Sequence, residues 1–368
     1  MKYSLGILLL LSCYVQAKTQ GNIRLGIEQH KQDKSSTDIA IGGMLKYESE
    51  KFYGTNLGVG FYSVNALNKH NNNGVPFYST QNRNYQLLGE AYIQANLQNT
   101  YLTLGRQVLD TPFLDSDDIG MIPDLYEAYT LRNSDLKDTT ITLSYVTKMA
   151  GIDASMPEHF SKINGNDALE MLGIVYEGIQ NISLQTWYYH IKNQAEIIYL
   201  EAGYEGSNEE VKYAFGAQYA IQNHKENKKA KITGLSAEIG HPQSGLDFTF
   251  AYNKTDSTND QEAENFYGAG PFFTCSEHLT LADAGSDGDV LFASLSYDAT
   301  KIGIEGLSFM ISNSHLKGKN VKMHEMDLLA NYALKDNLSI DVIYSDIDDK
   351  VNKKESFKNT RVFVNYYF

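Results

Sequence analysis

Cysteine, proline, tryptophan and long apolar runs are all scarce in this sequence of 368 residues. Two cysteines, Cys13 and Cys275, cannot build a disulfide-rich scaffold. Beyond the N-terminal residues there is no stretch of about eighteen apolar residues, which excludes a helix that spans a membrane. Cationic side chains are in the minority, because 31 Lys and Arg stand against 45 Asp and Glu, a net charge of −14. The chain therefore offers no basic surface that would attract nucleic acid.

Residues 1–17 have the pattern of a cleaved signal peptide. A basic residue precedes a short apolar run, and Val-Gln-Ala at 15–17 places small or β-branched residues where a signal peptidase cleaves. We expect the mature chain to begin at Lys18 and to be exported, which leaves Cys275 as its one cysteine. A competing interpretation takes the Leu-Leu-Ser-Cys sequence as a lipoprotein signal with Cys13 lipidated.

The last nine residues alternate between apolar and polar side chains. A strand of this kind suits a wall between lipid and water, and a closed barrel is the sheet that leaves no unpaired backbone edge in hydrocarbon. An edge strand of a soluble sheet shows the same pattern over nine residues, so the rest of the chain has to decide. In a barrel, the terminal Tyr366 and Phe368 would be the signal that the barrel-assembly machinery reads. The apolar face holds Val362, Val364, Tyr366 and Phe368, and the polar face holds Arg361, Asn365 and Tyr367.

Segments of about ten residues with the same alternation recur along the chain, and this is the length of a tilted membrane-crossing strand. The prolines fall between these segments, where a missing N–H costs no ladder hydrogen bond. Tight connections such as 334–337 alternate with long ones such as 110–123 and 255–289. In one segment, the face predicted to be apolar holds Tyr85, Leu87, Ala91, Ile93 and Ala95.

These patterns predict an all-β fold, a transmembrane antiparallel up-and-down β-barrel of about 18 strands. No linker or change of composition divides residues 18–368, so we expect a single outer-membrane β-barrel domain. The short turns would face the periplasm and the long loops the outside, with the protein integral to a bacterial outer membrane.

Four short motifs carry a resemblance to a known family. They are Leu-Gly-Arg-Gln at 104–107, the stretch 111–129 with Met-Ile-Pro and Tyr-Glu-Ala-Tyr, Gln-Thr-Trp-Tyr-Tyr at 185–189, and Gly-Ala-Gly-Pro-Phe-Phe at 268–273. In this order they resemble the OprD-like outer-membrane porins, especially those of epsilonproteobacteria. The resemblance implies an 18-stranded barrel whose third external loop folds inward, with diffusion of small water-soluble solutes. Some members carry an arginine where this chain has Gly120, so their solute preference is not carried over.

A constriction is predicted from three carboxylates, Asp115, Asp117 and Asp118, which lie shortly before Pro123. Carboxylates confined in a narrow neck attract cations, and opposed rings of charge create a transverse field that orients dipolar solutes. Alternatives are a solvated loop tip or a calcium site, although the glycine and distal glutamate of an EF-hand loop are missing. Candidates for the pore wall are Arg24, Arg83, Glu90, Arg106, Lys148, Lys212, Glu325, Asp327 and Arg361.

Motifs of catalysis are lacking, so we expect no enzyme, catalytic residue, cofactor or metal. Neither a Gly-x-Ser-x-Gly elbow nor a His-Glu-x-x-His pair occurs. His278, with Ser276, Glu277 and Asp283, offers the residue types of a triad, as any long polar loop would. Trp187, Tyr188 and Tyr189 are interpreted as residues of the interfacial aromatic belt.

The predicted function is passive diffusion of small hydrophilic solutes and ions, with cations or basic solutes favoured. The alternative is a surface adhesin or receptor that acts through its external loops while the barrel is a support. Expected partners are outer-membrane lipid and lipopolysaccharide, the solutes and the barrel-assembly machinery. The sequence leaves open a monomer or a homotrimer.

Overall fold

The computed structural model describes residues 18–68, 77, 84–116, 118–165 and 167–368. The predicted signal peptide, Arg83 and Asp117 lie outside these ranges. Among the described residues, the helices are three short 3-10 turns, η1 (Leu281–Ala284), η2 (Ala299–Ile302) and η3 (Lys353–Glu355). None of the described helices is long and apolar enough to cross a bilayer.

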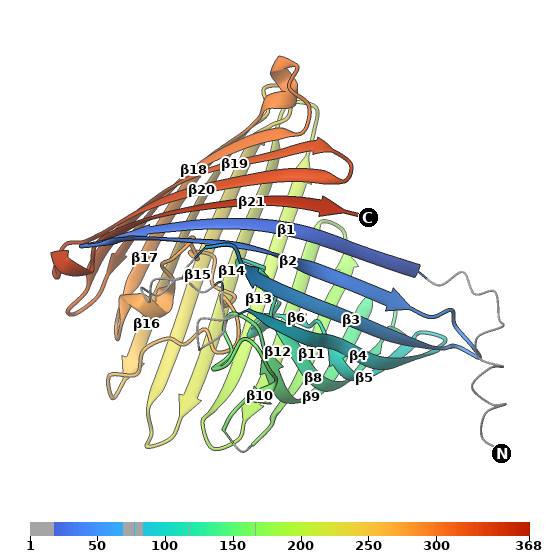
Figure 1. The fold of residues 1–368 in the computed structure, drawn as a ribbon. Coiled ribbons are helices and arrows are strands. Elements are labelled where there is room, and N and C mark those ends of the chain that lie inside the picture. The colour runs from blue at the N-terminus through green and yellow to red at the C-terminus, as the bar shows by residue number, and fades with distance from the viewer. Residues whose placement is uncertain (1–17, 69–76, 78–83, 117, 166) are drawn as a thin grey trace, which may run out of the picture.

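The chain folds into a closed antiparallel barrel of 18 strands, as predicted. Closure is made by the two ends of the chain, because β1 pairs with β21 over ten residue pairs that include Glu28 and Arg361. Figure 1 shows this seam, where the blue first strand lies beside the red last one. The barrel strands are β1 (Lys18–Lys31), β2 (Ser35–Glu48), β3 (Thr55–Ala66), β4 (Tyr85–Leu97), β5 (Thr100–Gln107), β8 (Leu125–Asn133), β9 (Thr139–Ala150), β11 (Leu169–Ile179), β12 (Ile182–Ile191), β13 (Ala195–Ser207), β14 (Lys212–His224), β15 (Lys229–His241), β16 (Leu246–Thr258), β17 (Asp289–Asp298), β18 (Leu307–Lys317), β19 (Lys322–Lys335), β20 (Leu338–Asp349) and β21 (Phe357–Tyr367).

Three two-residue strands lie in the connections. β6 (Asp110–Thr111) pairs with β7 (Leu114–Asp115) in the long connection between β5 and β8. β10 (Ser161–Lys162) extends the sheet beside the end of β9. Long connections, including 108–124, 151–168 and 259–288, emerge at the barrel end opposite the turns 98–99, 180–181 and 336–337. This asymmetry agrees with the predicted orientation, in which the long connections are external.

Burial along the strands is inverted relative to a soluble protein. On β1, the apolar Ile23 is 48% exposed, whereas its neighbour Arg24 is 6% exposed. The final strand behaves in the same way, since Arg361 and Asn365 are buried and Tyr366 is exposed. The polar face therefore lines the lumen and the apolar face meets lipid, as the alternation predicts.

The prediction for the faces of β4 was wrong over half of the strand. Tyr85 and Leu87 face the interior, not the same side as Ile93. The reason is a β-bulge, because the pairing of β3 with β4 shifts register at Gly60 and Phe61, opposite Glu90 and Leu88. One extra residue in a strand exchanges its inner and outer faces.

Candidate functional site

The connection 108–124 contacts two walls of the barrel that lie far apart around the ring. On one side, the ring of Phe113 packs edge-on against Tyr189 of β12 and Tyr199 of β13. On the other side, Asp118 binds Arg24 of β1. Seven barrel strands lie between β1 and β12 in the direction of the chain, and eight lie between β12 and β21 the other way. The contacts of this one segment therefore join opposite walls.

Arg24 uses its whole guanidinium group to hold the segment. Its two terminal nitrogens donate to the Asp118 carboxylate at 2.6 and 2.7 Å. It also donates to the carbonyl oxygen of Gly120 at 2.7 Å, and its Nε donates to Asn365 Oδ1 at 2.7 Å. A bidentate arginine–carboxylate pair of this kind fixes orientation as well as position. The aromatic ring of Phe363 lies 5.1 Å from the guanidinium carbon.

A second long connection, 259–288, is held from the same side of the barrel. Arg361 of β21 donates to Glu277 at 2.5 Å and to the carbonyl oxygen of Ile119 at 3.1 Å, so it touches both connections. Glu325 of β19 accepts hydrogen bonds from the Ser276 hydroxyl at 2.7 Å and from the backbone N–H groups of residues 278 and 279 at 2.9 and 2.8 Å. These three hydrogen bonds hold the connection to a carboxylate that is fully buried.

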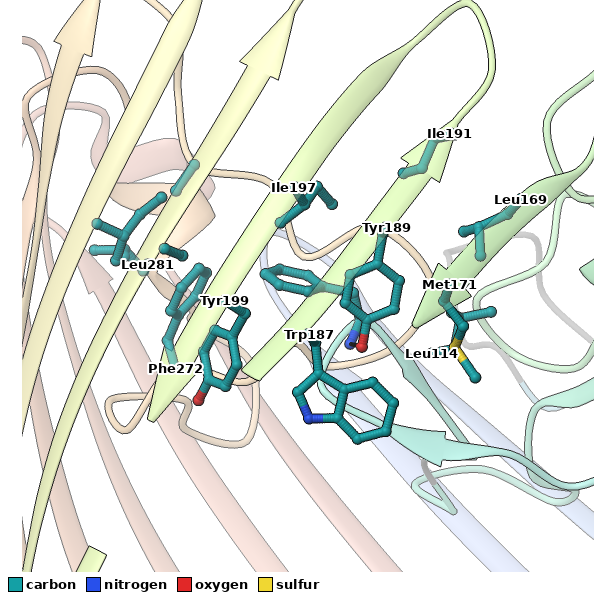
Figure 2. Close-up of a cluster of buried hydrophobic side chains, with 14 of the residues drawn as sticks. Leu114, Leu169, Met171, Trp187, Tyr189, Ile191, Ile197, Tyr199, Phe272 and Leu281 are labelled. Carbon is teal, nitrogen blue, oxygen red and sulfur yellow. Dashed lines mark hydrogen bonds between the residues drawn. The ribbon is translucent and has the colours of Figure 1, made fainter. Parts of the chain in front are cut away.

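An apolar cluster fills the opposite side of the interior, where both connections meet β11 to β13. Figure 2 shows Trp187, Tyr189 and Tyr199 of this wall beside Phe272 of the connection 259–288. Phe113 lies at the centre, within 6.1 Å of four aromatic rings by centroid distance. Tyr126 of β8 also links the two connections, since its Oη donates to the carbonyl oxygens of Asp115 and Tyr267.

The prediction that Trp187 and Tyr189 belong to the interfacial belt was therefore wrong. Both are buried in the interior, with exposures of 6% and 0%, and only the intervening Tyr188 is exposed on the outer face. Three consecutive aromatic residues match the composition of an interfacial belt. However, a strand places alternate side chains on opposite faces, so the three cannot all face the lipid.

A cavity of about 1090 Å³ lies in the lumen against this aromatic wall. Its ionisable lining includes four carboxylates and one cation, Arg132. A hydrogen-bonded chain orders the wall, because Trp187 Nε1 donates to Gln185 and Gln185 donates to Glu201. The carboxylates are Asp110, Asp115, Glu177 and Glu201.

A smaller cavity of about 450 Å³ lies on the other side of the connection 108–124. Arg24, Asp118, Tyr62 and Pro123 are among its lining residues. The predicted constriction residues Asp118 and Pro123 thus line one cavity, and Asp115 lines the other.

The other predicted wall residues fall into two groups. Glu90, Lys212, Glu325 and Asp327 face the interior together with Arg24 and Arg361. Glu90 accepts from Lys46 at 2.6 Å and from Tyr62 Oη at 2.9 Å, Lys212 pairs with Asp247 at 2.9 Å, and Asp327 accepts from Ser312 at 2.8 Å.

Arg106 and Lys148 do not line the lumen, which corrects the prediction for these two residues. In the register of β5, Arg106 lies beside Ala91 and Glu127, on the face that carries the exposed Leu104, whereas the next residue, Gln107, is buried inside. Lys148 pairs with Glu127 at 2.7 Å on the same outer face. A register shift between β8 and β9 at this point moves Lys148 outward.

Ionisable groups of the two connections have perturbed pKa values. Burial raises the pKa of the Asp115 carboxyl, and the charges of Asp110 and Asp153 raise it further. Burial also raises the pKa of Glu277, although Arg361 acts in the opposite direction.

The residue types of a catalytic triad do not assemble into one. The Ser276 hydroxyl donates to Glu325 and to the carbonyl oxygen of Leu279. Burial lowers the pKa of His278 to about 3, so this imidazole is a poor base. Within the described ranges, no three His, Cys, Asp or Glu side chains converge where they could hold a metal ion.

Several contributors to the lumen were missed from the sequence, among them Glu201 and Lys46. Glu201 of β13 lies in a segment whose alternation is weak, and Lys46 interrupts a strand whose other face is strongly apolar. The spacing along each strand could have identified both residues. Glu201 lies two residues from the inward-facing Tyr199, and Lys46 lies two residues from the inward-facing Met44.

A closed barrel with an apolar outer face and a polar lumen defines an outer-membrane channel. A family model described as outer membrane porin, OprD family, matches residues 20–368. The chain therefore belongs to the OprD family of outer-membrane porins, which are non-enzymatic. A search of curated protein sequences finds no match.

Solved structures share the fold at low sequence identity. The BenF-like porin from Pseudomonas fluorescens Pf-5 matches with a TM-score of 0.85 and 12% identity, over 96% of this chain and 98% of that one. Pseudomonas aeruginosa OpdK, solved with vanillate, gives 0.83 and 14%, and Acinetobacter baumannii OccAB4 gives 0.83 and 15%, both over the same shares of the chains.

Proposed function

We propose that this outer-membrane porin passes small hydrophilic solutes and ions by passive diffusion and favours cations and basic solutes. The observation that carries the preference is the large lumenal cavity, where Asp110, Asp115, Glu177 and Glu201 face a single cation, Arg132. Carboxylates around a narrow aqueous path raise the local concentration of cations and lower that of anions.

The rest of the inner wall supports the same sign. Carboxylates outnumber cations on the inward faces of the described strands, and several of the cations are neutralised by ion pairs. The inward carboxylates include Glu28, Asp38, Glu48, Glu90, Glu177, Glu201, Asp247, Glu325, Asp327 and Asp341, and the inward cations include Arg24, Lys46, Arg132, Lys212 and Arg361.

We further propose that the connection 108–124 is the inward-folded third external loop and forms the constriction. Its contacts with Arg24 on one wall and with Tyr189 and Tyr199 on the other support this role. Solutes would pass along the two cavities that flank it, one lined by Asp115 and the other by Asp118.

Planar-bilayer recordings test the preference directly. Under a KCl gradient, the reversal potential should have the sign of a cation-selective channel. Glu201→Gln should reduce the cation-to-anion permeability ratio, because it removes a charge from the cavity wall. Glu196→Gln is the matched control, since Glu196 lies on the same strand but on the outer face, 3.7 Å from His190.

A reversal potential near zero in the wild type would overturn the cation preference but not the porin assignment. Equal shifts in the Glu201→Gln and Glu196→Gln variants would show that the effect does not arise in the lumen. Absence of steady conductance steps would count against open diffusion itself.

The partners of the porin are proposed on the same basis. Tyr366, exposed on the outer face of β21, and Phe368, exposed directly after the strand ends, are the residues proposed to engage the barrel-assembly machinery. The outer wall would contact lipopolysaccharide, and the subunit would work as a monomer or a homotrimer. Crosslinking in native membranes distinguishes the two assemblies.

A further inference from the structure

Four basic side chains form a compact patch on the outer face of β18 and β19. His315 is directly opposite His324, and Lys317 is directly opposite Lys322, two residues further along both strands. The imidazole centroids lie 4.4 Å apart. Leu316 and Glu325, which alternate with these residues, are buried in the interior, so the four basic groups point away from the lumen. We name this set the basic patch.

Like charges in directly opposed positions of a sheet repel each other. Among the described residues, no carboxylate lies within ion-pair distance of Lys317 or Lys322. The acidic neighbours are largely engaged elsewhere, because Asp348, opposite His324, pairs with Lys350, and Asp346 pairs with Lys358 at 2.5 Å.

Two further charges face the patch from the neighbouring strands. Asp289 of β17 is opposite Lys317 on its other side, and Lys254 of β16 lies beyond it in the same row. Lys254 is held by Asp256 at 2.6 Å. The cross-strand row of Lys254, Asp289, Lys317 and Lys322 therefore contains three lysines and one carboxylate. Asp289 alone does not neutralise both Lys317 and Lys322.

The position of the patch identifies the phase that it meets. It lies at the end of the barrel from which the long connections emerge, next to the 318–321 connection. Towards the other end, the same outer face becomes apolar, with Phe309, Ile311 and Leu328 each exposed by 43–45%. A cationic group directly above an apolar band lies at the level of the lipid headgroups of the outer leaflet.

We propose that the basic patch binds a phosphate group of the phosphorylated glycolipid of the outer leaflet, lipopolysaccharide. The two lysines supply the donors from adjacent strands, and the paired histidines lie directly below them, where Nε2 of His324 is hydrogen-bonded to Asn313 Oδ1 at 3.0 Å. An anion between Lys317 and Lys322 removes their mutual repulsion, and the acyl chains of the same lipid cover the apolar band. This inference rests on the outer-membrane location and is independent of ion preference.

The test uses the full-length porin in detergent with added lipopolysaccharide. Wild-type protein is compared with the Lys317→Gln/Lys322→Gln variant and with Lys301→Gln/Lys335→Gln, whose lysines lie at the opposite end of the barrel. We expect the patch variant to bind lipopolysaccharide roughly thirtyfold more weakly, the magnitude for two lysines near an anionic lipid surface. The control variant should bind like the wild type, and Lys317→Arg/Lys322→Arg should retain binding.

Separate arms distinguish the sources of the anion. Dephosphorylated lipopolysaccharide should bind the wild type as weakly as phosphorylated lipopolysaccharide binds the patch variant. If inorganic phosphate alone bound the patch as tightly as lipopolysaccharide does, the patch would be a general anion site, and the lipid assignment would be overturned. The proposal would be overturned if a patch variant with normal heat-modifiable migration and conductance bound lipopolysaccharide as tightly as the wild type. It would also be overturned if the substitutions only abolished a crosslinked oligomer and left lipopolysaccharide binding unchanged.

Discussion

The ion pair between Arg24 and Asp118 allows a prediction in which two substitutions act in opposite directions. Arg24→Gln leaves the Asp118 carboxylate uncompensated beside the lumenal cavity, and Asp118→Asn leaves the Arg24 guanidinium uncompensated. The first variant should become more cation-selective and the second less so. The double variant restores local neutrality and should lie near the wild type.

The magnitude follows from the distance of a passing ion. A unit charge at about 6 Å in water contributes about 0.7 kcal/mol to the energy of a monovalent ion, which changes its local concentration roughly threefold. Asp118 is 50% exposed at its side chain, so the high dielectric value is the appropriate one. Each single substitution should therefore change the ratio of cation to anion permeability roughly tenfold at low salt, and because the two act in opposite directions, the single variants should differ by roughly a hundredfold.

Reversal potentials under a KCl gradient measure this ratio. The double variant also separates the effect of charge from the effect of a loosened connection. It lacks the bidentate bond between Arg24 and Asp118, but its net charge is that of the wild type. If the two single variants shift the reversal potential in the same direction, the effect reports a moved segment and not the charge of the pair. No shift in either variant would refute the location of the pair beside the ion path.

Further predictions concern stability, backbone geometry and pH. Glu325→Gln should destabilise the barrel by about 1.5–3 kcal/mol, since a buried carboxylate that accepts three hydrogen bonds is replaced, and a lowered urea midpoint would show this. Gly43→Ala should cost about 1–3 kcal/mol, because φ is +139° and an added Cβ would lie 2.0 Å from the carbonyl oxygen of Asn22; in heat-modifiable migration it should be more labile than Gly303→Ala, where no atom lies within 4 Å. Burial raises the pKa of Asp115, so its charge is lost at a higher pH than that of an ordinary carboxyl, and cation preference should begin to fall earlier on acidification than in Asp115→Asn, measured by reversal potential against pH.

The barrel itself could be predicted because lipid and water impose a pattern on every strand. The alternation of Val362, Val364 and Tyr366 with Arg361 and Asn365 is reproduced in the structure, and the seam with β1 follows from it. A single strand is ambiguous, but a repeated period of two leaves no other arrangement that satisfies both solvents and the backbone.

Faces were predicted wrongly where the period of two is broken or where residue type was preferred over spacing. The bulge opposite Gly60 reverses Tyr85 and Leu87, and a bulge is a property of a strand pair that one strand does not encode. For Trp187 and Tyr188 the sequence already places the two neighbouring side chains on opposite faces of a strand, but the aromatic composition of a membrane belt was given more weight. In the structure Tyr188 is exposed and Trp187 is buried.

The contacts inside the lumen could not be predicted because they join distant parts of the chain. Arg24 and Asp118 are 94 residues apart, and Arg361 and Glu277 are 84 residues apart. The sequence contains both arginines and the acidic cluster, yet many pairings of such residues are compatible with a barrel.

The apolar cluster around Phe113 explains how a water-containing barrel can hold a defined polar neck. A segment tied to the wall only by the ion pair with Arg24 and the hydrogen bond from Arg361 to the carbonyl oxygen of Ile119 would depend on polar contacts that water and salt weaken. Burial of Phe113 among aromatic rings of the opposite wall adds a contribution of about 1.5–3 kcal/mol that salt does not screen. Because apolar packing holds one side of the segment and charge holds the other, Asp115 and Asp118 are kept between them at fixed positions, where their charges can act on passing ions.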